Sequence, residues 1–108
     1  MKLKTSKKVI NGVVKSYFSD GKLAMISNYK EGKKHGPCKF YLRNGKLRAH
    51  GNFSNGMMTG TWKWWREDGN LWQVGNFKDN KKNGSWKIYD KSGKLYFSSK
   101  FKDNKKIK

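Results

Sequence analysis

The candidates for acid–base chemistry in this sequence are seven carboxylates, and each lies at or beside a predicted turn: Asp20, Glu31, Glu67, Asp68, Asp79, Asp90 and Asp103. Acid–base catalysis of the two-carboxylate kind needs a pair of carboxyl groups that face one site. No predicted strand interior supplies even one. Asp before Gly is a common turn residue because it tolerates the backbone that a turn requires. The acids therefore indicate turns, and we expect a protein that is not an enzyme.

Two histidines and one cysteine are the remaining reactive side chains. His35 lies in a lysine-rich turn, where a solvated polar role is the simpler interpretation, and His50 lies on a strand. A zinc site takes about four ligands, more than these residues and scattered acids supply. A nucleophile pair of Cys38 and His35 is the catalytic alternative, but Cys38 occupies a position where other repeats carry tryptophan. We interpret it as a core substitution and expect no metal and no cofactor.

The composition bounds the class of protein. The 108 residues suffice for one small domain. Lysine and arginine total 26 against 7 acids, a net charge of +19, yet 15% of the residues are aromatic, which disfavours disorder. A lone cysteine excludes a disulfide framework. The basic N-terminus lacks an apolar core, and no apolar run approaches the about 20 residues of a membrane span. These features favour a cytoplasmic protein.

The strongest signal is an internal repeat with a period of about 24 residues. It holds at seven positions without an insertion between Gly12 and Phe101. The most regular sets are Gly21, Gly45, Gly69 and Gly93; Leu23, Leu47, Leu71 and Leu95; Tyr17, Tyr41, Trp65 and Tyr89; and Tyr29, Phe53, Phe77 and Phe101. We divide the single domain of residues 1–108 into a partial unit 1–16, units 17–40, 41–64 and 65–88, and a final unit 89–108.

Each unit is predicted to form two strands. Apolar residues alternate, as in Trp62 and Trp64, and period two indicates strand. We expect strands near 12–18, 23–29, 37–42, 47–53, 61–66, 71–77, 85–90 and 94–101, with an extra strand near 2–5. Asp20-Gly21 and its equivalents predict the tight hairpin turns, with positive φ at both central residues. The turns at 30–34, 54–59 and 78–83 are expected to be longer. The result is an all-β, single-layer antiparallel meander of about 8–9 strands.

The best-preserved unit reads Trp65-Arg-Glu-Asp-Gly-Asn-Leu, then Gly75-Asn-Phe77, then Gly84-Ser-Trp86-Lys-Ile-Tyr89. This pattern resembles the MORN repeat in its bacterial variant, which has a similar period, and the resemblance extends over most of the chain. Ser27 and Ser99 depart from it at the glycine before the second aromatic residue, and Cys38 departs at a tryptophan. The resemblance implies a binding scaffold, and some bacterial members look like antitoxins. Other MORN arrays are linked to protein partners and membrane lipids.

The lysines of the longer turns form one set of candidate binding residues. Because the units stack, these turns should line one side of the sheet at steps of about 10 Å. The set comprises Lys30, Lys33, Lys34, Lys78, Lys81, Lys82, Lys105 and Lys106. Three interpretations stay open: protection of open sheet edges from aggregation, attraction of RNA, DNA or an anionic membrane, and encounter with an acidic protein. The open edges also make a homodimer plausible.

The second candidate set lies in the middle unit, where Met57 and Met58 interrupt the lysine pattern and are expected to be exposed. Beside them is a concentration of tryptophans: Trp62, Trp64, Trp65 and Trp72. The adjacent Trp64 and Trp65 must point to opposite faces, so one apolar face of a single-layer sheet stays open unless the sheet curls. An exposed apolar patch flanked by lysines is typical of a protein interface.

These patterns predict a non-enzymatic protein-binding module. The expected role is an inhibitor or antitoxin-like protein that occludes a bacterial effector, such as a toxin, a defence nuclease of CRISPR type, or its ribonucleoprotein complex. The alternative is sequence-nonspecific binding of nucleic acid or anionic lipid through the lysine-rich flanks. The scarcity of arginine argues against precise base reading.

Overall fold

The computed structural model describes residues 10–108, so the extra strand expected near 2–5 lies outside the described residues. The described chain forms strands only, with no helix. Their bounds are β1 (Gly12–Tyr17), β2 (Leu23–Lys30), β3 (Lys33–Tyr41), β4 (Leu47–Ser54), β5 (Met57–Trp65), β6 (Leu71–Lys78), β7 (Lys81–Tyr89), β8 (Leu95–Lys102) and β9 (Lys105–Lys106).

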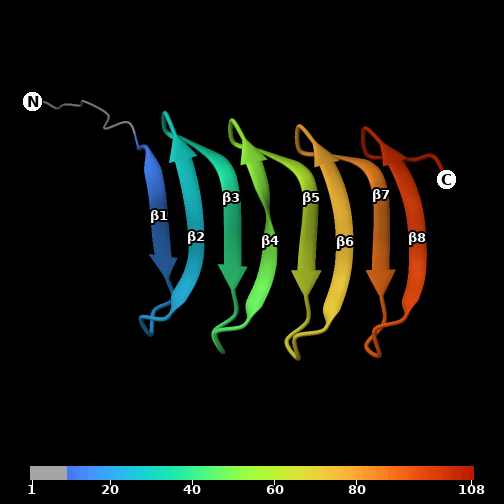
Figure 1. Cartoon of the computed structure of the whole chain (residues 1–108), viewed down its shortest axis with the longest axis horizontal. Helices are drawn as coiled ribbons and strands as arrows, with labels where there is room; N and C mark the ends of the chain where they lie inside the picture. Colours follow the sequence, from blue (N-terminus) through green and yellow to red (C-terminus); the bar gives the residue numbers. More distant parts are fainter. Residues whose placement is uncertain (1–9) are drawn as a thin grey trace, which may run out of the picture.

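All nine strands belong to one open antiparallel sheet in which each strand pairs with the next along the chain (Figure 1). The order β1 to β9 is therefore both the sequence order and the spatial order. The molecule is 57 Å long and 20 Å thin, as a single layer of stacked hairpins requires. The predicted all-β meander is confirmed.

Three strands are longer than predicted. β3, β5 and β7 begin well before the expected starts at 37, 61 and 85. Gly36, just before the predicted strand at 37–42, has a φ of 101° and lies inside β3, where the register with β2 shifts between Ser27 and Tyr29. The glycine thus forms a bulge, which lets the strand continue to the hairpin.

The two kinds of turn are the reverse of the prediction. At Ser19-Asp20-Gly21 only the glycine has positive φ, and the Phe18 amide bonds to the Lys22 carbonyl at 2.8 Å. This is a three-residue loop, in which a type I turn precedes one left-handed residue. The tight two-residue turns lie at the other end of the strands: Glu31-Gly32, Asn55-Gly56, Asp79-Asn80 and Asp103-Asn104. We call these two margins the loop edge and the tight-turn edge.

Successive tight turns are hydrogen-bonded to one another, which ties each unit to the one before it. The amides of Gly56 and Asn80 donate to the carbonyls of Lys34 and Met58 at 2.8 and 3.0 Å. The Asn80 side chain returns a bond by accepting from the Met58 amide at 2.7 Å. His35, expected to be solvated, takes part as well, because its Nδ1 accepts from the Asn55 amide at 3.3 Å.

Candidate interaction surface

One face of the sheet carries a continuous array of aromatic rings, which we call the aromatic face. Trp62 and Trp64 stack at 6.1 Å between ring centroids, and Trp64 lies 5.7 Å from Trp86. Phe53 and Phe77 contact Trp62 and Trp86 edge-on, at 5.2 and 5.4 Å. These separations are typical of favourable aromatic pairs. No second layer of the described chain covers the array, but neighbouring side chains cover its innermost rings, so Trp62 and Trp86 are only 2% and 7% exposed. Contrary to the expectation, Trp62 is therefore not part of an exposed patch.

The middle of the aromatic face holds a shallow hollow of about 260 Å³. Its walls are mostly ring carbons and aliphatic groups, with one guanidinium at the rim. The lining residues are Phe40, Arg48, Ala49, Phe53, Met58, Trp62 and Trp64. An apolar depression of this kind accepts a protruding apolar side chain of a partner, because burying apolar area stabilises the contact.

Lys34, Met58 and Lys82 occupy equivalent positions of three successive repeats. The Lys34 ammonium lies 5.1 Å from the Phe53 ring centroid, and the Lys82 ammonium lies 4.6 Å from that of Trp86. These two lysines therefore lie over the aromatic face, not along a separate ridge of turns. Met58 stands between them, and it is half-buried where exposure was expected.

Met57 is 36% exposed, as expected, at the position that Lys33 and Lys81 hold in the flanking units. The two methionines thus replace a lysine pair next to the hollow. The middle of the aromatic face therefore lacks the lysine that both ends carry at this position. The structure brings Met58, Trp62 and Trp64 together around one hollow.

Trp65 and Trp72 lie apart from this group. Trp65 follows Trp64 at the end of β5, so its side chain points to the opposite face, as the alternation predicted. Trp72 is 39% exposed, and its ring centroid lies 5.6 Å from the Arg66 guanidinium. The expected concentration of four tryptophans is therefore divided between different surroundings.

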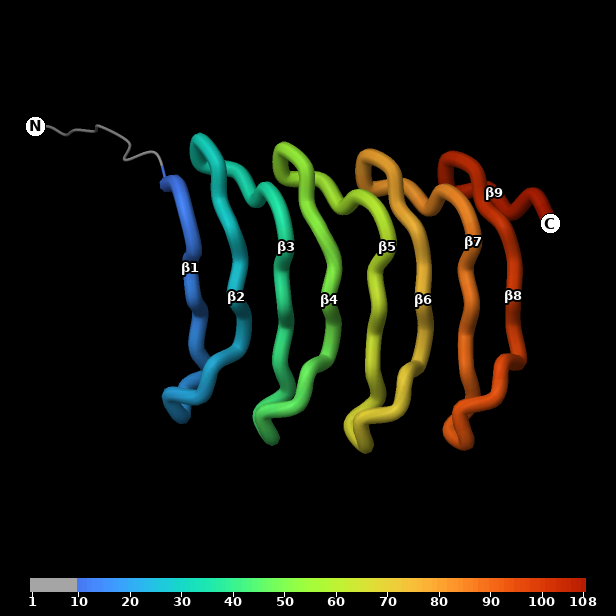
Figure 2. The backbone as a smooth tube through the Cα atoms, viewed as in Figure 1, coloured from blue at the N-terminus to red at the C-terminus, as the bar shows by residue number. Residues whose placement is uncertain are grey.

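The other candidate lysines lie at the ends of the strands along the tight-turn edge, whose turns align in one row (Figure 2). Each is exposed: Lys30, Lys33, Lys78, Lys81 and Lys105. Lys106 also belongs to this edge, and its ammonium lies 5.6 Å from the Phe97 ring. The position of these lysines at the edge agrees with the expectation, and their role in binding stays a prediction.

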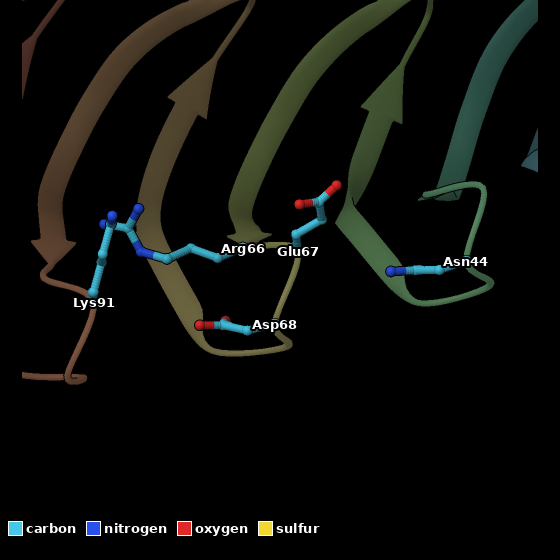
Figure 3. Close-up of a pocket in the computed structure, with 5 residues that line it drawn as sticks. All are labelled: Asn44, Arg66, Glu67, Asp68 and Lys91. Atoms are coloured by element: carbon cyan, nitrogen blue, oxygen red, sulfur yellow. The ribbon is translucent and has the colours of Figure 1, made fainter.

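A further hollow, of about 560 Å³, lies at the loop edge and contains two carboxylates (Figure 3). Glu67 and Asp68 point in different directions there. Asp68 accepts from the Asn70 amide at 2.8 Å, and Arg66 donates to the Tyr89 carbonyl at 2.9 Å. Asp68 and Arg66 thus bind the backbone of the loops, and the two carboxylates do not face one site.

Cys38 is buried, 1% exposed, and its Sγ lies 3.2 Å from the Ser27 hydroxyl. This placement agrees with its interpretation as a core residue in place of tryptophan. Among residues 10–108, no three His, Cys, Asp or Glu side chains gather in a way that could hold a metal ion. The described part of the chain also contains no helix long and apolar enough to cross a membrane.

One regular set was not singled out from the sequence. Lys15, Lys39, Lys63 and Lys87 recur once per repeat, as the glycines and leucines do. All four are exposed strand residues on the face opposite the aromatic array. These four lysines recur with the same period as the core residues, so the repeat could have identified them from the sequence.

A single-layer array of similar hairpins, each in contact with its neighbours along the chain, defines a repeat protein. The chain belongs to the MORN repeat variant family, which matches residues 10–31, 34–55, 58–79 and 82–103. MORN repeats are in general protein- or lipid-binding modules and not enzymes. No curated protein matches the sequence.

Proposed function

We propose that this chain is a protein-binding module that docks its aromatic face on an acidic protein and acts by occlusion. The observation that carries the proposal is the apolar hollow at the centre of the aromatic face, lined by Met58, Trp62 and Trp64. Apolar anchors at the centre of a polar rim are the usual anatomy of protein interfaces. Methionine suits such a centre because its flexible thioether adapts to a partner.

The rim favours an acidic partner. Lys34 lies over Phe53 at the hollow, Lys82 lies over Trp86 farther along the same face, and the described strands contain no Asp or Glu. The net charge of +19 would speed encounter with a negative surface and reject basic partners. The proposed target is a bacterial effector, either a toxin or a defence nuclease of CRISPR type. Docking would use an acidic patch of that protein.

The decisive variant is Met57→Lys together with Met58→Lys. It re-creates the lysine pairs already present at Lys33-Lys34 and Lys81-Lys82, so it should fold as its sister units do. Tagged wild-type protein and this variant are used to capture partners from nuclease-treated host lysate at physiological salt. We expect the wild type to retain one partner stoichiometrically and the variant to lose it, with an unchanged melting temperature.

A matched control replaces Lys30 and Lys78 with Gln, which removes charge at the tight-turn edge without touching the aromatic face. This control should bind more slowly but keep the complex, since rim charges act mainly on association rate. Purified partner is then titrated with each protein, and its own activity should fall to zero at one equivalent. Equal capture by the double-methionine variant, or a complex lost on nuclease treatment, would overturn the proposal.

A further inference from the structure

The face opposite the aromatic array carries a straight row of lysines. Cross-strand pairing runs Lys15–Ile26–Lys39–His50–Lys63–Val74–Lys87–Ser98, one residue from each of β1 to β8. Since neighbouring strands lie about 4.8 Å apart, the lysines follow one another at steps of about 10 Å. We call this set the lysine row. Its direction is across the strands, along the length of the molecule.

A row of aromatic residues runs beside the lysine row. Tyr17, Tyr41, Trp65 and Tyr89 each follow a lysine of the row by two positions on the same strand. Residues two apart share a face of a strand and lie about 7 Å from each other. Tyr17 is 59% exposed, and the other three are half-buried. Each unit thus presents one ammonium group and one ring side by side on this face.

The lysine row crosses the middle of the strands. On its tight-turn side, Asn28, Asn52 and Asn76 occupy the equivalent positions of three units and Lys100 that of the fourth, and Lys30 and Lys78 lie at the ends of β2 and β6 on the same face. Two of these amides are engaged within the sheet, since Asn28 donates to the Pro37 carbonyl at 2.9 Å and Asn76 to the Ser85 carbonyl at 3.0 Å. The described strands contain no carboxylate that could neutralise the lysines. The face is therefore positive, and the lysine row is its regular track across the strands.

We propose that this face binds single-stranded nucleic acid without sequence preference. The phosphodiester backbone lies along the lysine row, and bases stack on the parallel ring row. Lysine tracks beside stacking rings are the general means by which proteins hold single strands, because every base has a π-face. A flexible single strand follows a straight line, whereas the phosphates of a duplex follow a helix.

The test measures fluorescence anisotropy with labelled oligo(dT) and a mixed-sequence RNA, each of about 12 nucleotides, a length within known single-strand site sizes. The row variant replaces Lys15, Lys39, Lys63 and Lys87 with Gln. The matched control replaces Lys30, Lys78, Lys102 and Lys105 with Gln, which removes the same charge from the tight-turn edge. Circular dichroism and melting temperature verify that both variants fold.

The row variant should bind about 100-fold more weakly than the wild type at physiological salt. The slope of log K against log salt concentration should decrease in magnitude by about 3, because four phosphate contacts are lost. The control should lose far less. Tyr17→Leu should weaken binding at least about fivefold, whereas Tyr17→Phe keeps a stacking ring and should bind normally.

Three results would overturn the proposal. Equal losses in the row variant and its control would mean that only net charge acts. Tighter binding to a duplex of the same length would exclude the single-strand geometry. Stronger binding to phosphatidylserine vesicles, lost in the same row variant, would assign the face to a membrane instead.

Discussion

The indole of Trp62 lies so close to the backbone of Gly51, on the neighbouring strand, that a β-carbon at residue 51 would overlap the ring. Trp86 covers Gly75 in the same way. Where no indole covers this position, the chain has serine, because Ser27 pairs with Cys38. The departures of this chain from the regular repeat at Ser27 and Cys38 are therefore one feature. The small side chain of Cys38 leaves room for Ser27, whereas a tryptophan at this position requires glycine on the neighbouring strand.

Gly51→Ala tests this packing directly. The added methyl group must displace the Trp62 indole, so we expect a loss of about 1–3 kcal/mol in the free energy of unfolding, as for other overpacked cores. Ser27→Ala is the matched control, because that site already holds a β-carbon, and it should cost about 1 kcal/mol or less. Urea denaturation measures both. Equal losses would contradict the account.

The pairing rule predicts a rescue. Cys38→Trp should destabilise the protein because Ser27 occupies the space in which the new indole must lie. Adding Ser27→Gly re-creates the Gly51–Trp62 arrangement and should recover the loss. A double-mutant cycle by chemical denaturation should give a favourable coupling of about 1–3 kcal/mol, within the range for residues in contact. Additive effects would show that the two positions are independent.

His35 should be replaceable by asparagine but not by alanine. Its Nδ1 accepts from the Asn55 amide, just as the Asn11 side chain accepts from the Glu31 amide at 2.8 Å one unit earlier. Loss of one hydrogen bond costs about 0.5–1.5 kcal/mol. We expect His35→Ala to lose about this much, and His35→Asn to retain it, in thermal unfolding. Amide exchange at Asn55 should rise in the alanine variant alone.

Asp90 should link stability to acid pH. Its carboxylate accepts from the Ser92 hydroxyl at 2.7 Å and from the Lys94 amide at 2.9 Å. These bonds, the Ser92 side chain first, lower the pKa of Asp90 below its ordinary value of 3.8. A lowered folded-state pKa means stabilisation that is present in full above the unfolded-state pKa of 3.8 and lost as the pH falls through the folded pKa.

A carboxyl-carbon NMR titration should therefore place the Asp90 midpoint below 3.8. Ser92→Ala removes the main cause and should move the midpoint up towards that value. Asp90→Asn should abolish this part of the acid dependence of the melting temperature. A wild-type midpoint at or above the ordinary value would be inconsistent with the hydrogen bonds seen at the loop.

Most of the fold could be predicted from the repeat. Glycines and leucines at a constant interval determined the strand count and meander order, because a unit that recurs without insertion must stack on its own copies. The turn types were reversed for a local reason. Asp20-Gly21 and Asn55-Gly56 are similar in composition, and the difference is the φ of the residue before the glycine, which follows from the cross-strand register.

The site was harder to predict than the fold. Lys34 and Lys82 were placed in the longer turns at 30–34 and 78–83, whereas the bulges at Gly36 and Gly84 bring both lysines into strands and over the rings. Composition also gathered Trp62, Trp64, Trp65 and Trp72 into one patch. The faces of the sheet divide Trp64 from Trp65, and only the pairing of each strand shows which rings meet.

The hydrogen bonds between successive tight turns have a consequence for how the array comes apart. Extensive contacts join only consecutive strands, so each hairpin is supported from two sides and the outermost ones from one side alone. Unfolding should start at a terminus and travel inward hairpin by hairpin, as in one-dimensional repeat arrays. Trimming a terminal hairpin would therefore leave a shorter folded array, and the central hollow beside Met58 would be the last surface to melt.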